Sequence, residues 1–293
     1  MIVNYFSHGM VARLLESLDC STFGDAVVVD NSVDSGEFRN LMRVVEGNGI
    51  RAVAMPSNVG FGAAVNAGVD LLNPDADGRI WILNPDTIAT SDVAVRLARA
   101  LDEYGADMAS PVICTGVDDE IWFGGGDIDI RRGRTSHWSY RPELVVECDF
   151  LTAAAVMISV SAWWRLGGFR ADLFMYWEDA DLCLRAGELG MRMVVDPAAM
   201  IWHEVGATTS TRGKSALYYY YMERNRMVVL ADSSGVCCLW SRSALFEAFR
   251  ILVRAGREPV GRTEKVVSAV RGIASGARYA IRRRGAQVVG AHS

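Results

Sequence analysis

Hydrophobic residues in the first 90 positions alternate between short continuous runs and runs at helical spacing. The continuous runs occupy residues 1–6, 26–29, 50–55 and 80–83. Such runs are typical of strands in a parallel sheet, which is covered on both faces. Between them, residues 11–18 and 38–45 have apolar positions three and four apart, the spacing of a helix. The alternation predicts an α/β fold with an open, mostly parallel sheet and flanking helices.

Polar residues follow these predicted strands directly. Asp30 ends the second run, and Asn84 and Asp86 follow the fourth. Residues 58–68 form a glycine-containing loop that leads into a helical stretch. Because ligands in open α/β sheets bind beyond the carboxyl ends of the strands, we expect a binding site at these positions.

A second concentration of polar residues lies at residues 174–185. Glu178, Asp179 and Asp181 come directly after an apolar and aromatic run, and they predict a helix that begins at Glu178. Acidic residues are favoured in the first turn of a helix by its dipole. Asp181 and Arg185 are four apart and can pair along the helix. Glu178 and Asp179 are then left at the helix start, where a carboxylate can act as a general base. The alternative is an ordinary helix that begins with acidic residues.

The last third of the chain is helical in pattern and basic. Residues 1–212 contain 16 Arg, no Lys and 30 acidic residues, a net charge of −14, whereas residues 213–293 carry +9. We therefore predict a catalytic domain at residues 1–213 and a basic helical region at residues 214–293. The last predicted helix has an apolar face made of Val266, Val267, Val270, Ile273 and Ala277. A basic amphipathic helix can lie on a membrane surface, and packing on the catalytic domain or on a partner is the alternative.

Composition narrows the function classes. The chain has 293 residues, of which 51% are hydrophobic, enough for one large domain with an appendage. Residues 150–164 form the longest apolar stretch, too short to span a bilayer, and no signal peptide is recognisable. The six cysteines lack zinc-ligand spacing, so we expect reduced thiols and a cytoplasmic protein, with peripheral membrane contact as an open question. No Lys precedes Lys214, which excludes a Walker P-loop there, so metal, arginine or backbone amides must hold any phosphate.

The ordered set of motifs resembles one known family. The matching stretches are residues 28–34 (VVDNSVD), 58–62 (NVGFG) with Asn66, 84–86 (NPD), 177–185 (WEDADLCLR) and 203–204 (HE). They span about residues 1–230. Together they are similar to family 2 glycosyltransferases of the GT-A fold, in the bacterial rhamnosyltransferase-like branch.

The resemblance implies a role for each matching residue. Asp86 would bind a divalent cation, Mg²⁺ or Mn²⁺, with His203 as a second ligand, and Asp179 would be the general base. Trp122, Trp177 and Glu178 would lie on the acceptor side. The nucleotide-sugar donor would be bound by Asn4, Asp30, Asn58, Gly60, Phe61, Asn66, Asn84 and Asp86.

The implied reaction is an inverting, metal-dependent glycosyl transfer in bacterial cell-wall or polysaccharide biosynthesis. The donor would be dTDP-rhamnose, and the acceptor a hydroxyl of a saccharide, a lipid-linked sugar or a natural product. A galactofuranosyl- or other hexosyltransferase that uses a UDP-sugar is the first alternative, and a non-catalytic paralogue that binds nucleotide sugars is the second. A sugar nucleotidyltransferase would need a glycine-rich loop with Arg and Lys near the N-terminus, which residues 3–18 lack. We expect no nucleic-acid partner, and a homo-oligomer remains open.

Several of these residues have simpler interpretations. Asp30 and the Asn84–Asp86 segment could form turns alone, and His203 could be a core histidine. Arg212 and Arg224 could reach phosphate or lie on the surface. Two departures from the family concern the acceptor side: residues 152–154 are Thr-Ala-Ala where Thr-Gly-Ala is usual, and Arg170 replaces the usual Asp after Gly-Gly-Phe.

Overall fold

The computed structural model describes the backbone of residues 1–116, 118–204 and 213–290, with side chains up to residue 283. The chain forms two compact units, which we describe separately. The sheet unit comprises Met1–Asp127, His137–Phe174 and Glu178–Ala207. The helical unit comprises Ile128–Ser136, Met175–Trp177 and Thr208–Ser293. Residues 206–213 are small and polar, which predicts a loop, but they fall almost entirely outside the described residues. Arg212 also lies outside them, and the predicted boundary at residue 213 stays a prediction.

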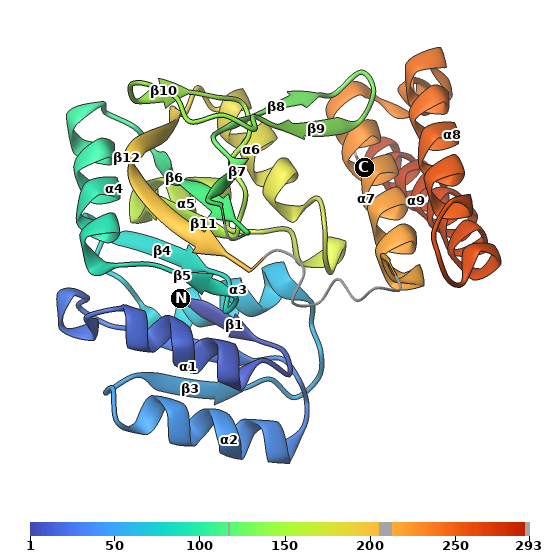
Figure 1. The fold of residues 1–293 in the computed structure, drawn as a ribbon. Coiled ribbons are helices and arrows are strands. Elements are labelled where there is room, and N and C mark those ends of the chain that lie inside the picture. Colours follow the sequence, from blue (N-terminus) through green and yellow to red (C-terminus); the bar gives the residue numbers. More distant parts are fainter. Residues whose placement is uncertain (117, 205–212, 291–293) are drawn as a thin grey trace. The chain divides into compact units, whose positions relative to one another are not determined.

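A ten-stranded sheet organises the sheet unit (Figure 1). Its strand order is β10-β12-β6-β11-β4-β1-β2-β3, with β5 on β12 and β7 on β6. In chain order the strands are β1 Ile2–Asn4, β2 Val27–Asp30, β3 Arg51–Ala54, β4 Arg79–Leu83, β5 Thr87–Ile88, β6 Met108–Thr115, β7 Glu120–Phe123, β10 Val146–Glu147, β11 Ala155–Ser159 and β12 Met193–His203. β8 Gly126–Asp129 and β9 Arg134–His137 form a separate two-stranded sheet.

The first half of the sheet is parallel, as the sequence predicts. β1 lies between β2 and β4 and pairs in parallel with both, and β2 pairs in parallel with β3. All four residues of β2 are buried, which explains its continuous apolar run. The second half is mixed, because β11 runs antiparallel to both β4 and β6. The carboxyl ends of β1, β2 and β4 therefore meet at one edge, where Asn4, Asp30 and Asn84 lie.

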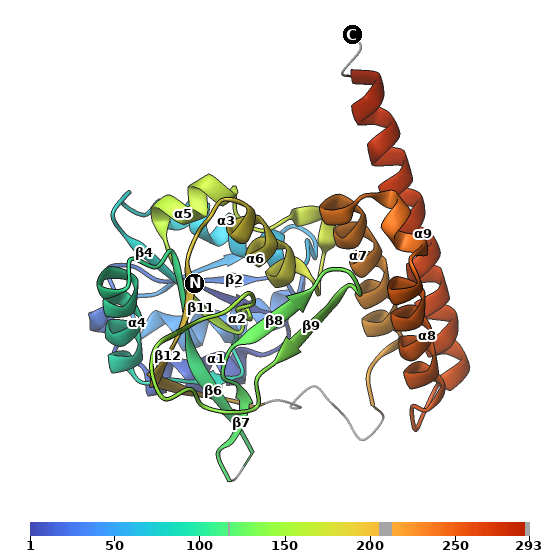
Figure 2. The same ribbon diagram turned by 90° about the horizontal axis from the view of Figure 1, so that it is seen from above.

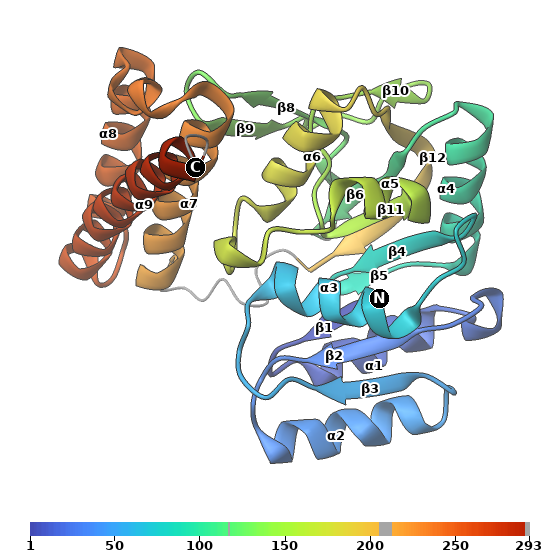
Figure 3. The same ribbon diagram turned by 180° about the vertical axis from the view of Figure 1, so that it is seen from behind.

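Helices cover both faces of this sheet. They are α1 His8–Ser17, α2 Ser35–Glu46, α3 Phe61–Leu72, α4 Ser91–Glu103, α5 Val160–Leu166 and α6 Glu178–Glu188. Figure 1 shows α1 in front of the sheet, and Figure 3, from the opposite side, shows α3 in front, so these two helices cover opposite faces. The predicted α/β architecture with flanking helices is thus confirmed.

The helical unit contains α7 Ala216–Ser234, α8 Arg242–Gly256 and α9 Arg262–Gly290. α9 packs along both α7 and α8 (Figure 2). Its predicted apolar face is divided, because Val266, Ile273 and Ala277 pack into the unit whereas Val267 and Val270 are exposed. Within the described residues, no helix combines the length and the apolar character needed to cross a membrane.

Candidate functional site

His203 and Asp86 come together through the pairing of β5 with β12. His203 is the last residue of β12 and lies opposite Thr87 of β5, one residue after Asp86. The backbone N–H of Glu204 donates to the Asp86 carbonyl at 2.9 Å and locks this register. As a result, His203 Nε2 lies 3.0 Å from Asp86 Oδ1.

The surroundings of His203 are apolar. The residue is 8% exposed, and the Trp122 ring of β7 meets its imidazole edge-on at 5.0 Å. Its buried Nδ1 atom has no hydrogen-bond partner in the described part of the chain. The Asp86 side chain is more open, at 18% exposure. The imidazole is therefore held at the edge of a core cluster, with Nε2 directed to the carboxylate.

This pair fits two ligands of one divalent cation. A carboxylate oxygen and an imidazole nitrogen that each bind a metal at about 2.0–2.2 Å can stand about 3 Å apart. No group of three or more His, Cys, Asp or Glu side chains capable of holding a metal is present among the described residues. A cation here would take its remaining ligands from water and from substrate oxygens, as Mg²⁺ does when it binds through one or two carboxylates and phosphates.

Glu178 and Asp179 begin α6, as the sequence predicts, and backbone contacts connect them to the same edge of the sheet. The Ala153 N–H donates to the Asp179 carboxylate. The next residue, Ala154, accepts a hydrogen bond of 2.8 Å from the Asn84 N–H. Two consecutive residues before β11 thus link Asp179 to the segment that carries Asp86.

The two adjacent carboxyl groups differ in access and in protonation. Glu178 is buried and its Oε2 atom has no partner among the described residues, whereas Asp179 is partly exposed. Burial raises the pKa of Asp179 to about 6, although N–H groups of Ala180 and Ala153 oppose the rise. Burial and then the charge of Asp179 raise the pKa of Glu178 to about 8. At neutral pH the pair therefore shares one proton, and Asp179 is the member that is partly exposed.

Ion pairs fix the start of α6. The predicted pair of Asp181 and Arg185 is confirmed, with Arg185 Nε 2.8 Å from Asp181 Oδ2. Arg170 also binds Asp181 at 3.1 Å, as well as Asp172 at 2.9 Å. The departure from the family at position 170 thus supplies a cation that anchors the helix. Leu182 and Ala186 of α6 are buried, whereas Leu189, which shares their helical spacing, follows the helix end at Glu188 and is 48% exposed.

An unusual backbone precedes Glu178. Phe174, Tyr176 and Trp177 all have positive φ angles of 61°, 65° and 70°, which are rare for bulky residues. Within the helical unit, the Asn225 side chain donates to the carbonyls of Met175 and Tyr176, both at 2.8 Å. Trp177 is buried, and its Nε1 has no partner among the described residues. Its predicted place on the acceptor side stays a prediction, as does that of Trp122.

The carboxyl ends of β1 and β2 carry a buried polar network. The Asn4 amide donates to Asp30 Oδ1 at 2.8 Å and to Glu37 Oε1 at 3.0 Å. Asp30 also accepts from Ser32 Oγ at 2.7 Å, so it does form the turn considered as an alternative. His8 Nδ1 lies 2.7 Å from Glu37 Oε2. The predicted roles of Asn4 and Asp30 in donor binding are compatible with this network and stay predictions.

The loop before α3 is positioned by close contacts. Asn58 Oδ1 accepts from the Gly60 N–H at 3.0 Å, and Phe61 N–H donates to the Phe174 carbonyl at 2.8 Å. Gly60 has φ +85°, and a Cβ there would stand 2.2 Å from the Phe174 oxygen, so glycine is required. The Asn66 side chain makes two bonds with the Phe169 backbone, at 2.7 and 2.9 Å, and joins α3 to the glycine pair that precedes α6. The predicted roles of Asn58, Gly60, Phe61 and Asn66 in donor binding likewise stay predictions.

Sequence reasoning missed three charged or titratable residues near these positions. Glu37 and His8 complete the network around Asp30, and Arg13 binds Glu204 through two bonds of 2.8 and 2.6 Å. Glu37 follows the helix cap Asp34 by three positions, so its sequence context indicated only a helix start. Arg13 lies on the polar side of a helix, where arginine is common. No signal in the sequence distinguished them.

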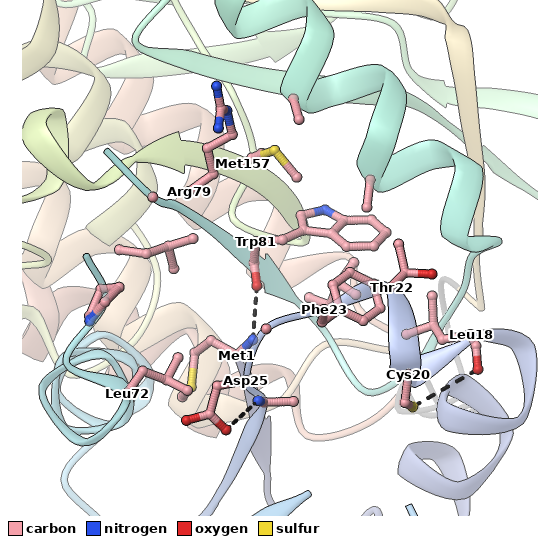
Figure 4. Close-up of a pocket in the computed structure, with 18 of the residues that line it drawn as sticks. Met1, Leu18, Cys20, Thr22, Phe23, Asp25, Leu72, Arg79, Trp81 and Met157 are labelled. Atoms are coloured by element: carbon pink, nitrogen blue, oxygen red, sulfur yellow. Dashed lines mark hydrogen bonds between the residues drawn. The ribbon is translucent and has the colours of Figure 1, made fainter. Parts of the chain in front are cut away.

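A cavity of about 730 Å³ lies at the opposite, amino end of β1 and β4 (Figure 4). Leu18, Phe23, Trp81 and Met157 contribute to its walls. None of the predicted site residues lines it. Because strand carboxyl ends carry the titratable groups, the candidate site is at the other edge of the sheet.

Comparisons with known proteins agree with the resemblance seen in the sequence. No protein-family model matches the chain. Over 215 residues the chain is 26% identical to N-acetylglucosaminyl-diphospho-decaprenol L-rhamnosyltransferase of Mycobacterium tuberculosis, which covers 62% of this chain and 67% of that protein. Two strains of that organism give the same match.

Solved structures with a similar fold include three glycosyltransferases. Residues 1–349 of S. aureus TarS match with a TM-score of 0.58 and 14% identity, over 94% of this chain and 79% of that one. GalNAc-T7 with UDP, GalNAc and Mn²⁺ matches with a TM-score of 0.57 and 10% identity, over 99% of this chain and 56% of that one. The mannosyltransferase PcManGT of Pyrobaculum calidifontis with GDP-Man and Mn²⁺ matches with a TM-score of 0.55 and 13% identity, over 100% of this chain and 79% of that one. The expected GT-A fold is thereby confirmed.

Proposed function

We propose that this protein is an inverting, metal-dependent glycosyltransferase that moves a sugar from a nucleotide diphosphate to an acceptor hydroxyl. The observation that carries the proposal is the Asp86–His203 pair at 3.0 Å, linked through Ala154 and Ala153 to the partly exposed carboxylate of Asp179. The pair is suited to hold a cation, and Asp179 is suited to take a proton. The similar rhamnosyltransferase and the shared fold support glycosyl transfer as the reaction class.

Asp86 and His203 would hold the cation together with the donor diphosphate. The chemistry that a divalent cation would supply there is neutralisation of the charge on the leaving diphosphate. Residues 1–212 contain no lysine that could do so instead. Two similar structures are in complex with Mn²⁺, which supports a divalent cation, and an imidazole ligand favours Mn²⁺ over Mg²⁺.

Asp179 would act as the general base. Its carboxylate takes the proton of the acceptor hydroxyl while that oxygen forms the new bond to the anomeric carbon. The bond from the anomeric carbon to the diphosphate oxygen breaks, and its electron pair leaves with the nucleoside diphosphate. A single displacement of this kind inverts the anomeric configuration. The pair shares one proton at neutral pH, which leaves one negative charge, and Asp179 is the partly exposed member that an acceptor could reach.

The donor we propose is dTDP-rhamnose. The similarity to an L-rhamnosyltransferase supports this sugar. Similar structures contain UDP-GlcNAc, UDP or GDP-Man, so a UDP-sugar is the alternative donor. For the acceptor we propose a lipid-linked sugar, by analogy with the relative's diphospho-decaprenol, and a saccharide or natural product is the alternative. A cytoplasmic location and a homo-oligomer remain predictions from the sequence.

A donor-turnover assay tests the proposal. The protein is incubated with dTDP-rhamnose, UDP-galactofuranose, UDP-GlcNAc or GDP-mannose, with Mn²⁺ or with EDTA. We expect release of nucleoside diphosphate that needs metal and is fastest with dTDP-rhamnose. Release from none of the four donors, combined with tight binding of one of them, would identify a non-catalytic nucleotide-sugar-binding protein instead.

A further inference from the structure

The helical unit contains a groove that the glycosyl transfer does not use. α9 approaches α7 closely at two glycines. A Cβ on Gly272 would stand 2.3 Å from the Tyr220 carbonyl oxygen, and a Cβ on Gly276 would stand 2.2 Å from the Arg224 carbonyl oxygen. Beside this contact is a groove of about 650 Å³. Its polar lining residues are Tyr220, Arg271, Ser275, Arg278, Tyr279 and Arg282.

Three arginines dominate this groove. Arg271, Arg278 and Arg282 are seven and four residues apart, so they lie on one side of α9. All three are exposed, and no ion pair involves them within the described residues. Among the residues that the structure describes, no acidic one lines the groove.

Four carboxylates of α7, of α8 and of the segment between α8 and α9 are bound to other cations, and Glu264 at the start of α9 does not line the groove. These pairs are Glu223 with Arg226, Asp232 with Arg283, Glu247 with Arg250 and Glu258 with Lys265. Within the described residues, the three arginines of the groove therefore have no carboxylate paired with them.

The chemistry of the groove matches phosphate. Guanidinium groups bind phosphate oxygens through two parallel N–H bonds and are less strongly hydrated than ammonium groups. The Tyr220 hydroxyl donates to Ser275 Oγ at 3.1 Å, which places two further hydroxyl groups on the wall. Three arginines in a row along a helix offer several phosphate contacts at once.

Apolar side chains on the same helix indicate where that phosphate is located. Val267, Val270 and Ile281 are 43%, 50% and 51% exposed, and their spacing puts them beside the arginine row. A free phosphate ion gives no reason for exposed valine and isoleucine next to its site. A bilayer does, since its headgroups carry phosphate and its acyl region accepts apolar side chains. A second copy of this surface would instead bring like charges together.

We propose that this groove binds the phosphate groups of anionic lipids at a membrane surface, with Val267, Val270 and Ile281 entering the headgroup boundary. The inference does not depend on the proposed glycosyl transfer, since it concerns only the helical unit. It refines the membrane contact expected from the sequence by assigning it to the arginine row and not to the buried face of α9.

The test is vesicle co-sedimentation of the full-length protein. Vesicles contain phosphatidylcholine alone or with 30 mol% phosphatidylglycerol, in about 0.1 M salt. We expect binding to the anionic vesicles only, and loss of binding as salt is raised. The triple variant Arg271→Gln, Arg278→Gln, Arg282→Gln should bind the anionic vesicles on the order of 100-fold more weakly, because each arginine should contribute about fivefold to the affinity.

The matched control is a triple variant of α8, Arg242→Gln, Arg254→Gln, Arg257→Gln, which removes the same charge from exposed positions of the same unit. We expect it to bind within a few-fold of the wild type. An equal loss of vesicle binding in both variants would show that binding depends only on the net charge of the protein, and it would overturn the proposed site. Thermal unfolding of both variants checks that they fold.

A calorimetric titration with inorganic pyrophosphate separates the lipid from a soluble ligand. We expect no binding tighter than the millimolar range in the absence of vesicles. Tight pyrophosphate binding that the α9 variant loses, without vesicle binding by the wild type, would overturn the lipid assignment.

Discussion

His203 Nε2 lies 3.0 Å from Asp86 Oδ1, although 117 positions separate the two residues in the chain. The contact depends on the short strand β5, which follows Asp86 and pairs with the end of β12. An imidazole and a carboxylate in this arrangement could form a simple hydrogen bond or hold a cation between them. The two interpretations give different results in binding experiments.

Asp86→Asn should remove metal-dependent donor binding. The amide keeps the size of the side chain but loses the charge that a hard cation needs. Loss of a direct ligand should cost more than about 100-fold in donor affinity, since changes one shell further out already cost about 10–100-fold. Calorimetry with dTDP-rhamnose and Mn²⁺, with and without EDTA, measures this. Asp70→Asn, an exposed position on α3, is the control. If the wild type binds donor equally well in EDTA, the pair holds no cation that the donor needs.

His203→Ala should change the preference between metals more than it changes donor binding in Mg²⁺. Imidazole favours Mn²⁺ over Mg²⁺, so the variant should lose more affinity in Mn²⁺ than in Mg²⁺. Donor titrations in each metal give the ratio. An unchanged ratio, with a lower unfolding temperature, would assign His203 to the core cluster around Trp122.

Local patterns predicted much of the fold. The fully buried strand β2 and the acidic start of α6 could both be predicted, because each depends on residues that are neighbours in the sequence. The antiparallel insertion of β11 between β4 and β6 was not, since it depends on pairing over long sequence distances. The burial of Val266 against α7 and α8, but not of Val267, likewise follows from the position of those helices.

The candidate site was predictable for the residues that carry motifs and not for their partners. Asp86 follows a strand, and Asp179 lies in the first turn of a helix. Both are positions where the sequence indicates a function. The buried role of Asn4, which donates to both Asp30 and Glu37, depends on three separate segments. Arg170 departs from the family pattern, and only its contact with Asp181 explains it as an anchor.

Glu178→Gln should make stability less dependent on pH. The pKa of Glu178 is raised from 4.5 to about 8 in the folded protein, so the folded state holds this proton more tightly than the unfolded state. Its contribution to the free energy of unfolding is complete below about pH 4.5 and is lost as the pH rises towards 8. Relative to the wild type, the variant should therefore gain in unfolding temperature between pH 5 and 9. A difference in unfolding temperature that stays constant over this range would contradict a buried, protonated Glu178.

The rate of transfer should rise with pH through a limb near pH 6. Asp179 must lose its proton before it can accept one, and its pKa is raised to about 6 by burial. Single-turnover transfer with saturating donor and metal, from pH 5 to 9, measures the limb. In Glu178→Gln the limb should remain near pH 6. A limb near pH 8 that this variant abolishes would identify Glu178 as the base.

The central claim is that Asp179 removes the acceptor proton, and Asp179→Asn tests it most directly. The amide keeps the shape of the side chain but cannot accept the proton. Donor affinity and single-turnover transfer are measured on the same preparation, with Glu178→Gln as the matched neighbour. We predict donor affinity within a few-fold of the wild type and transfer slower by about 10²–10⁴ in Asp179→Asn, with a smaller loss in Glu178→Gln. Transfer by Asp179→Asn at near the wild-type rate would contradict the account.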